Sequence, residues 1–230
     1  MIEISNLSKH FFIGERRIDV LRELNLSIKK DKITVILGRS GCGKTTLLRL
    51  IAGLESVSQG EIKFKEQAKI GFVFQEPRLM PFLNVYENIV FPLKKNEIEP
   101  EKIGSLISMI GLSDFKLASV SQLSGGMSSR VSLARVLAYE ANLILMDEPF
   151  AALDAFTRAS MQAEILKIQA GKTILFVTHN IDEALFLADE IILLEKGGIK
   201  SNYDLSNLAR PRDLLSEELI AIKRKILSEI

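Results

Sequence analysis

Residues 38–45 read GRSGCGKT, a pattern that is typical of phosphate-binding loops. The stretch follows the apolar run ITVIL and precedes a helical pattern, which is the context that the spacing G-x-x-x-x-G-K-[ST] requires. Glycines let the backbone approach a phosphate group, and successive N–H groups at a helix N-terminus supply positive potential. An ordinary Gly-rich turn needs neither the lysine nor the hydroxyl that follows it. We expect nucleotide contacts from Gly38, Arg39, Ser40, Gly41, Cys42, Gly43, Lys44, Thr45 and Thr46.

Two carboxylates follow another apolar run, LILM. Strand alternation would point Asp147 and Glu148 to different sides, so we expect them to do different work. Asp147 suits a Mg²⁺ shell together with the hydroxyl of Thr45, while Lys44 reaches the terminal phosphates. Glu148 can act on a water aimed at the γ-phosphate, as general base or as orienting group. The alternative is a solvated turn before Pro149, but open α/β sheets bind ligands at the carboxyl ends of core strands.

Gln75 and His179 occupy the same kind of position, each at the end of an apolar strand pattern. Gln75 ends IGFVFQ, and its neutral amide can touch Mg²⁺ or the attacking water. His179 follows TILFVT; taken alone, a histidine there is more often an ordinary loop residue. Because phosphate chemistry is expected at the same ends of neighbouring strands, we expect His179 to contact the γ-phosphate.

A second anion-binding pattern, LSGGM, begins at Leu123. Ser124 can cap a helix whose first amides, at Gly125 and Gly126, would attract an anion. The helix continues through an apolar stripe, so this pattern belongs to a helical segment rather than to the end of a core strand.

The elements that must position these groups follow a clear order. Short β-rich segments fill the first 75 residues and are interrupted by one helix, at 45–52. Residues 76–139 are mostly helical in pattern, and apolar strands then alternate with helices. We expect an α/β core at about 1–75 and 140–205, split by a helical subdomain at about 76–139, and a helical tail at 206–230.

Composition narrows the class of protein. The 230 residues are 47% apolar and 26% charged, which is typical of a soluble globular chain. The formal charge of +1 provides no global field for nucleic acid or anionic lipid, so we expect no nucleic-acid partner. A single cysteine, Cys42, and an N-terminus without signal-peptide character predict a reducing, cytoplasmic setting. No apolar run approaches the ~18 to 20 residues needed to cross a bilayer.

The ordered set GRSGCGKT, FVFQEP, LSGGM, LILMDEP, ALD and VTHN resembles the nucleotide-binding subunits of ABC transporters. The resemblance covers nearly the whole chain. It implies a P-loop NTPase (RecA-like) α/β core over 1–205, with an N-terminal antiparallel β subdomain and a helical insert that carries the signature. It also implies the following roles: Gln75 in the Q-loop, Ser124 to Gly126 as signature, Asp154 in the D-loop, His179 as switch, and Phe11 under adenine, with Phe12 as runner-up.

The resemblance further implies how such a subunit works. Two copies would bind ATP and Mg²⁺ head to tail, the signature of each closing over the γ-phosphate held by the other, and ATP hydrolysis would drive transport. The implied partners are an integral membrane permease and, for an importer, an extracytoplasmic solute-binding protein. The subunit would then lie at the cytoplasmic face of the cell membrane as a peripheral protein. The apolar and aromatic side chains of EPRLMPFLNVYENIVF would partly receive a helix of the permease and partly form subdomain core.

DEPFAALDAFTR and LARPRD are similar to segments of importer ATPases of the nitrate, sulfonate, taurine and bicarbonate group. This narrower resemblance implies uptake of a small anion, a sulfonate or a related nutrient. The chain departs from that group at Arg39, Ala151, Ser128 and Ser129. A soluble ABC ATPase outside transport is the alternative, whereas a P-loop GTPase or kinase is disfavoured because no N-K-x-D motif occurs and LSGGM would have no purpose. A silent binding module is disfavoured by the full set of catalytic groups.

Overall fold

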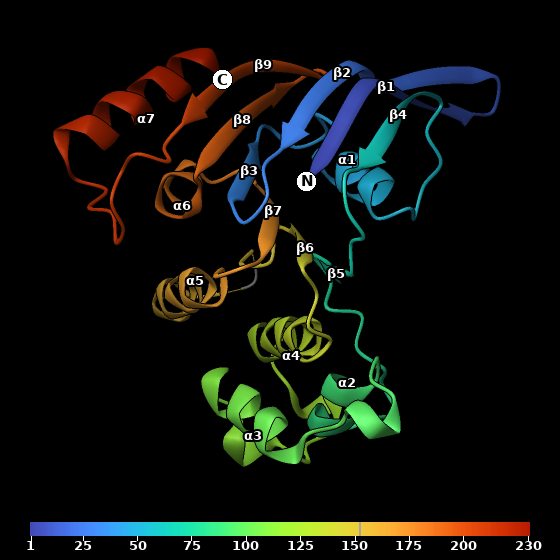
Figure 1. Ribbon diagram of the computed structural model, residues 1–230, viewed down its shortest axis with the longest axis vertical. Helices are drawn as coiled ribbons and strands as arrows, with labels where there is room; N and C mark the ends of the chain where they lie inside the picture. Colours follow the sequence, from blue (N-terminus) through green and yellow to red (C-terminus); the bar gives the residue numbers. More distant parts are fainter. Residues whose placement is uncertain (152) are drawn as a thin grey trace. The chain divides into compact units, whose positions relative to one another are not determined.

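A computed structural model describes residues 1–151 and 153–230. The described residues fall into two units. Unit 1 comprises Met1–Ala68 and Gln169–Ile230, and unit 2 comprises Lys69–Ile168. Unit 1 is rich in strands and contains the phosphate loop, whereas unit 2 contains most of the described helices (Figure 1).

An antiparallel sheet of unit 1 is formed by the N-terminal strands in the order β2-β1-β4. Their bounds are β1 Ile2–Ile13, β2 Arg16–Ile28 and β4 Gln59–Phe64. Along β1 the buried residues Ile2 and Ile4 alternate with more exposed neighbours, which is typical of an antiparallel sheet with one covered face. The expected N-terminal antiparallel subdomain is therefore present.

The other sheet of unit 1 has the order β7-β3-β8-β9. The bounds are β3 Ile33–Leu37, β7 Thr173–Thr178, β8 Glu190–Glu195 and β9 Gly198–Asp204, with helices α1 Lys44–Ile51 and α6 Ile181–Leu187. Strands β7, β3 and β8 are parallel, and β9 is antiparallel to β8. β3 and β7 are buried along their whole length, as expected for parallel strands covered on both faces. Leu37 pairs with both Thr178 and Leu193, so these strands end at one edge.

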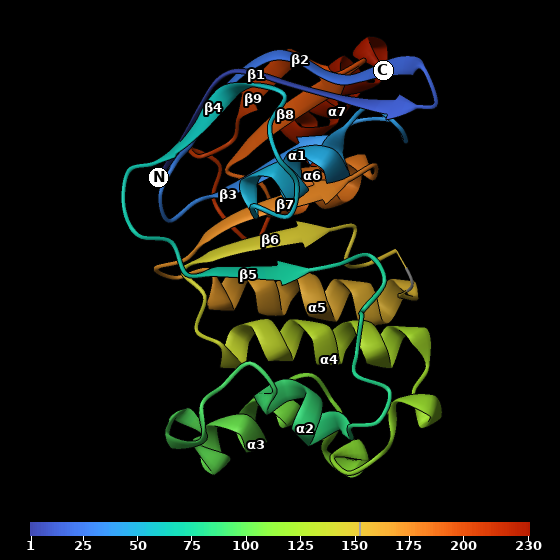
Figure 2. The same ribbon diagram turned by 90° about the vertical axis from the view of Figure 1, so that its right-hand side faces the viewer.

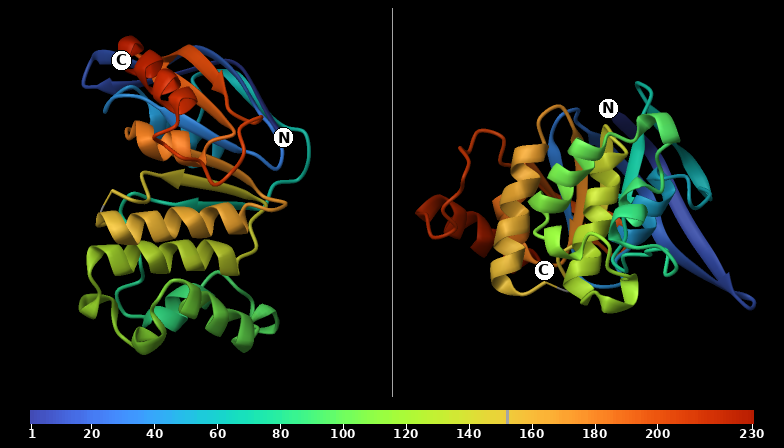
Figure 3. Two further views of the ribbon diagram at one scale, coloured as in Figure 1. Left: turned by 90° about the vertical axis from the view of Figure 1, so that its left-hand side faces the viewer. Right: turned by 90° about the horizontal axis from the view of Figure 1, so that it is seen from below.

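The C-terminal helix α7, Glu217–Glu229, packs on unit 1 (Figure 3). Ser216 caps it by accepting a hydrogen bond from the backbone N–H of Leu219. Leu219 and Ile226, seven positions apart, are buried, while most of the other side chains are exposed or half-buried. This spacing places one apolar stripe of α7 against the rest of the unit, where it contacts α6.

Unit 2 combines a strand pair with a helical layer. The bounds are β5 Ile70–Val73, β6 Leu143–Asp147, α2 Val85–Val90, α3 Pro100–Met109, α4 Gly125–Ala138 and α5 Ala155–Ile168. β5 and β6 are parallel, and α4 and α5 run side by side (Figures 2 and 3). Val131 and Ala134 of α4 join Val85, Ile89 and Ile103 in one buried cluster. Because α2, α3 and α4 share this cluster, the helical insert has a core of its own.

The segment between β5 and α2 is tied to the helices by two side chains. Arg135 of α4 donates to the carbonyl oxygens of Pro77 at 3.1 Å and Arg78 at 3.2 Å. Asn88 of α2 is fully buried; its Oδ1 accepts from Met80 N at 2.8 Å, and its amide donates to carbonyls of the same segment, including Met80 O. The chain from Pro77 to the start of α2 is therefore held against unit 2 by hydrogen bonds.

Among the described residues, none of the helices has the length and the apolar character that a membrane-spanning segment needs.

Candidate nucleotide-binding site

The phosphate loop of unit 1 curves around the side chain of Lys44. This lysine is only 5% exposed, and its Nζ donates to Gly38 O at 2.7 Å and Arg39 O at 3.0 Å. A buried ammonium group needs such acceptors, because leaving it without them costs free energy. Lys44 thus holds the loop in a closed curve and places a positive charge beneath it.

Two glycines of the loop are required by close packing. Gly43 has φ +107°, and a Cβ there would lie 2.7 Å from Leu21 Cδ2 and 3.0 Å from Val20 O of β2. A Cβ at Gly38 would lie 2.4 Å from Leu194 O of β8. Any side chain at either position would displace the loop from the strands that support it. The loop is therefore positioned by both sheets of unit 1.

The start of α1 suits an anion. Gly43 is its N-cap, and no side chain in the described part of the chain caps this helix. Its first turn carries no acidic residue, and Lys44 is its first residue. A helix N-terminus with these features favours negative charge, so the loop, Thr45 and Thr46 fit the phosphates of a nucleotide.

Cys42 is buried within the loop, and a Cβ at Gly38 would lie 2.8 Å from its Sγ. Burial raises the pKa of its thiol, an effect partly opposed by the charge of Lys44. A pocket of about 260 Å³ is lined here by residues 38–42, residues 193–196 at the end of β8, and Glu229 and Ile230. Cys42 is therefore a protonated, packed thiol rather than a reactive one.

His179 follows β7 and is exposed, in a turn that its neighbours hold in place. Asn180 caps α6, its Oδ1 accepting from the backbone N–H of Asp182 at 2.9 Å and of Glu183 at 3.3 Å. Thr178 Oγ1 donates to Glu183 Oε2 at 2.6 Å. Since Leu37 pairs with Thr178, His179 and the phosphate loop leave the same edge of the sheet, as the sequence pattern predicts.

Phe11 and Phe12 lie on opposite faces of β1, because successive strand residues alternate. Phe11 is half-buried, and Lys9 Nζ lies 4.6 Å from the centre of its ring. Phe12 is 65% exposed and meets the ring of His10 edge-on at 5.3 Å. Lys9 therefore makes a cation–π contact with Phe11, the residue expected under adenine.

The carboxylates of unit 2 differ in their surroundings. Asp147 is the last residue of β6 and is 4% exposed. Glu148 has φ +46°, in the left-handed region, and is half-buried. We expected alternation along a strand to point the two side chains to different sides. That reason is wrong, because the strand ends at Asp147 and the chain turns at Glu148. Holding a residue with a Cβ in this conformation costs about 1 kcal/mol, which the surrounding fold must supply.

Gln75 and Glu148 occupy matching positions after the paired strands β5 and β6. Val73, the last residue of β5, pairs with Met146, and each of the two polar residues follows its paired residue by two positions. Gln75 is exposed, and both leave the same edge of the β5–β6 pair. Unit 2 therefore gathers an amide and two carboxylates at one strand edge.

The signature residues begin α4, and the expected cap is observed. Ser124 is the N-cap, with Oγ accepting from Met127 N at 3.2 Å. Gly125 and Gly126 form the first turn of the helix; Gly125 is exposed and Gly126 half-buried. Ser129 Oγ donates to Gly125 O at 3.1 Å, a side-chain hydrogen bond within this first turn.

Asp154 caps α5 in the same manner. Its Oδ1 accepts from the backbone N–H of Phe156 and of Thr157, each at 3.0 Å, and its Oδ2 accepts from Thr157 Oγ1 at 2.6 Å. These hydrogen bonds, led by the one from the Thr157 side chain, lower the pKa of Asp154. The carboxylate of Asp154 thus serves as the cap at the N-terminus of α5. Ala152, the first residue of the ALD stretch, lies outside the described residues.

The expected residues divide between the units. Unit 1 contains the phosphate loop, Phe11 and His179; unit 2 contains Gln75, Ser124, Gly125, Gly126, Asp147, Glu148 and Asp154. Sequence reasoning missed Asn180 as the cap that fixes the turn of His179. An asparagine followed by Asp182 and Glu183 just after a strand is a readable helix start, so the signal was present.

Comparisons with known proteins show the family to which the chain belongs. The family described as ABC transporter matches residues 21–151. The chain is 40% identical over 238 residues, 99% of its length and 95% of the relative's, to an aliphatic sulfonates import ATP-binding protein of Bacillus cereus. It is 38% identical over 245 residues, 100% of its length and 51% of the relative's, to a spermidine/putrescine import ATP-binding protein of Bacteroides fragilis.

A solved structure shows the same fold. It is described as the dimeric, post-hydrolysis state of an ATP-binding cassette bound to ADP and Pi. The TM-score is 0.83 at 33% identity, covering 89% of this chain and 99% of the other. The expected P-loop NTPase core with an N-terminal antiparallel subdomain is confirmed. The chain belongs to the ABC transporter family, as one of its ATP-binding cassettes, the subunits that are ATPases.

Proposed function

We propose that this cassette powers an importer for sulfonates or related small anions. The observation that carries its ATPase role is the phosphate loop closed around buried Lys44. Support for the substrate class comes from relatives: sulfonate import proteins match over nearly the full chain at 37–42% identity. Polyamine import proteins match at 37–38%, so the substrate class is the part of the proposal that needs a direct test.

The residues present fit ATP with Mg²⁺. Thr45, Gln75 and Asp147 offer hydroxyl, amide and carboxylate oxygens, the hard ligands that this ion takes, and we assign them as its ligands. Bound Mg²⁺ would neutralise charge that develops on the phosphates. The loop amides and Lys44 hold the β- and γ-phosphates, and Phe11 stacks on the base.

Hydrolysis then depends on groups around the γ-phosphate. Glu148 orients the attacking water and accepts its proton. The left-handed backbone conformation of Glu148 fixes the direction in which its side chain leaves the chain, so the carboxylate needs little movement to reach the water. His179 donates to the γ-phosphate from the turn that Asn180 and Thr178 hold, and Gln75 contacts the metal or the water.

Two copies work head to tail. Ser124, Gly125 and Gly126 of each copy close over the γ-phosphate held by the other, and Asp154 places the start of α5 near this contact. The exposed, capped first turn of α4 supports the assignment, because its amides favour an anion. The dimeric state of the similar solved cassette supports it too. Closure and separation of the copies convert hydrolysis into a conformational change in the partner.

The partners that we propose are an integral membrane permease and, indirectly, an extracytoplasmic solute-binding protein, with no nucleic acid. The cassette is placed at the cytoplasmic face of the membrane as a peripheral subunit. The names of the relatives, import ATP-binding proteins, support this assignment. A hollow of unit 2 lined by Phe74, Met80, Phe91 and Tyr139 offers apolar surface for the permease.

The test is reconstitution in liposomes with the permease that co-purifies with this chain and with the matching solute-binding protein. We expect ATP hydrolysis that rises with taurine or another alkanesulfonate outside and not with spermidine. Stimulation by spermidine instead would overturn the substrate class. Robust hydrolysis by a chain that never co-purifies with a membrane protein would favour the soluble, non-transport ABC ATPase.

A further inference from the structure

Helix α6 begins directly after His179 and carries two carboxylates in its first turn. Glu183 is buried and accepts from Thr178 Oγ1 at 2.6 Å, so it ties α6 to the end of β7. Asp182 faces another element: its Oδ1 accepts from Lys223 Nζ at 2.5 Å, across 41 positions of sequence. Lys223 belongs to α7, so the C-terminal helix holds the first turn of α6.

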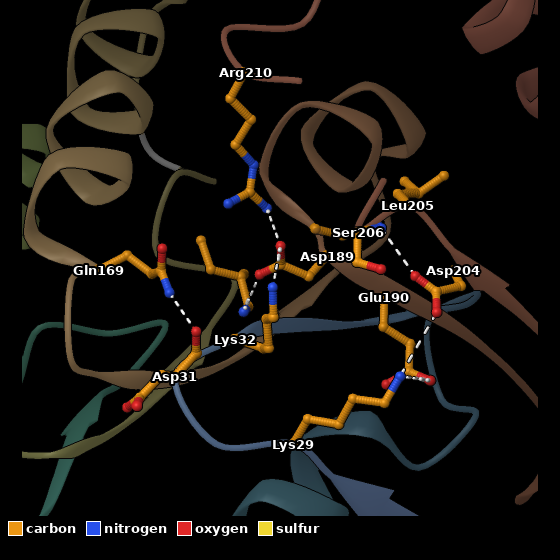
Figure 4. Close-up of polar contacts among 12 residues, drawn as sticks. Lys29, Asp31, Lys32, Gln169, Asp189, Glu190, Asp204, Leu205, Ser206 and Arg210 are labelled. Carbon is orange, nitrogen blue, oxygen red and sulfur yellow. Dashed lines mark hydrogen bonds and ion pairs between the residues drawn. The ribbon is translucent and has the colours of Figure 1, made fainter. Parts of the chain in front are cut away.

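The other end of α6 is held by the segment that leads into α7. Arg212 is 7% exposed and donates to Leu185 O at 2.8 Å and Ala188 O at 2.6 Å. Arg210 donates to Leu187 O and lies 3.3 Å from Asp189 Oδ1 (Figure 4). Burial lowers the pKa of Arg212 to about 10, so the guanidinium stays charged at neutral pH. Cations at a helix C-terminus are favourable and also satisfy its last carbonyls.

Asp189 connects Arg210, at the end of α6, to β3, the strand that precedes the phosphate loop. Its Oδ2 accepts from Ile33 N at 2.7 Å, at the start of β3, and Lys32 lies 3.7 Å from its Oδ1 (Figure 4). The carboxyl end of α6 is therefore fixed to the central sheet of unit 1. The amino end, beside His179, is held at two residues of its first turn: Glu183 through Thr178, and Asp182 through Lys223.

Helix α7, which holds the amino end of α6 through Lys223, is itself fixed to unit 1 by several contacts. Ile226 is fully buried, and Ser201 of β9 donates to Glu229 Oε2 at 2.5 Å. Lys225 lies over the ring of Tyr203 at 5.4 Å. Since α6 has only seven residues, it is too short to set its own direction, and contacts at its ends must do so.

We propose that Lys223 is a positioning residue for His179: through Asp182 it fixes the first turn of α6 and hence the turn that carries the histidine. The proposal rests on the proposed function, in which His179 contacts the γ-phosphate. The Lys223 and Asp182 side chains are 37% and 47% exposed, and such pairs add little to stability. The effect is therefore expected in the hydrolytic step, while ATP affinity, which the phosphate loop provides, stays unchanged.

The experiment compares Lys223→Ala with the conservative Lys223→Arg and with Arg224→Ala, the adjacent exposed basic residue of α7, as matched control. Steady-state phosphate release should show kcat lowered about tenfold by Lys223→Ala, because small misplacements of a reacting group are costly, with KM for ATP and Tm nearly unchanged. Lys223→Arg should restore kcat, and Arg224→Ala should match the parent. A parental kcat for Lys223→Ala, or loss of kcat only together with Tm, would overturn the proposal.

The charge exchange Asp182→Lys with Lys223→Asp should recover more activity than either single change. His179→Ala distinguishes the proposed role of His179 from the proposed role of Lys223. If His179→Ala hydrolyses ATP normally, the role of the histidine in the proposed function fails. If His179→Ala is inactive while Lys223→Ala is normal, only the positioning role fails. With both roles correct, adding Lys223→Ala to His179→Ala causes no further loss, because the two changes act through one group.

Discussion

Leu37, the last residue of β3, pairs in parallel register with Thr178, the last residue of β7. The phosphate loop continues from one and His179 from the other, although 141 positions separate the loop's first glycine from the histidine. The parallel sheet therefore places, within one unit, both the loop proposed to bind a terminal phosphate and the histidine proposed to contact it.

Replacing Lys44 with alanine should weaken nucleotide binding itself. The substitution removes a charge from beneath the loop and the two hydrogen bonds that close it. A hydrogen bond to a charged group contributes about 1.5–3 kcal/mol, so Kd for ATP should rise at least about tenfold. Equilibrium binding of a fluorescent ATP analogue measures the change. Unchanged affinity would count against the phosphate-loop assignment.

Glu148→Gln should keep ATP binding and slow cleavage by about 100-fold, because glutamine cannot accept the proton of the attacking water. A dimer that depends on ATP should then accumulate in size-exclusion chromatography. Adding Lys44→Ala to this variant should abolish the dimer, since it cannot bind ATP. A variant that stays monomeric with ATP and hydrolyses it normally would contradict the role of Glu148.

Ser124→Arg should leave ATP binding by the monomer largely intact and abolish hydrolysis, because the arginine blocks closure over the partner's nucleotide. Ser124 also caps α4, and losing a cap costs about 1 kcal/mol. Ser124→Asp retains the cap but brings a negative charge to the γ-phosphate, so it should fold normally and still be inactive. Hydrolysis at the parental rate by Ser124→Asp would show that the signature does not face phosphate.

Arg212→Ala should destabilise the fold by about 3 kcal/mol or more, since it removes three buried hydrogen bonds from a charged group, to the carbonyl oxygens of Leu185, Ala188 and Leu205. Arg212→Lys should recover only part of this loss, because one ammonium group cannot reproduce the spread of a guanidinium. Urea denaturation measures both, with Arg224→Ala as a surface control. A loss as small as that of the control would mean that the clamp on α6 is dispensable.

Cys42 should react slowly with iodoacetamide near neutral pH. Burial raises the pKa of the thiol, so the reactive thiolate is scarcer than for an exposed cysteine. The rate should keep increasing as the pH is raised from about 7 to about 10, and urea-unfolded protein should react much faster at the same pH. Mass spectrometry of the quenched protein follows the reaction. Rapid alkylation of the folded protein at pH 7 would contradict a buried, protonated thiol.

Patterns over a few residues correctly predicted those site residues whose positions depend on their neighbours in sequence. The phosphate loop, the strand that precedes it and the Ser124 cap all follow from spacing and residue type over a few positions. The left-handed backbone of Glu148 was not predictable in this way, because the surrounding fold rather than the side chain selects it.

Contacts across long stretches of sequence were not predictable either. In the sequence, LARPRD indicated only a similarity to one subgroup of importer ATPases. In the structure, its Arg210 and Arg212 donate hydrogen bonds to carbonyl oxygens at the end of α6. The pairing of Lys223 with Asp182 depends on how α7 packs, which the apolar stripe of α7 indicates only in outline. A single sequence shows that a helix has a buried face but not which element that face meets.

The hydrogen bonds from Arg135 and Asn88 have a mechanical consequence. Pro77 and Arg78 are attached to α4, and Met80 is attached to α2, so this stretch is stiff. Only Phe74, Gln75 and Glu76 lie between the end of β5 and Pro77, with Gln75 at the centre. Because Pro77 is bonded to Arg135 of α4, a displacement of that helix would be passed to the backbone next to Gln75.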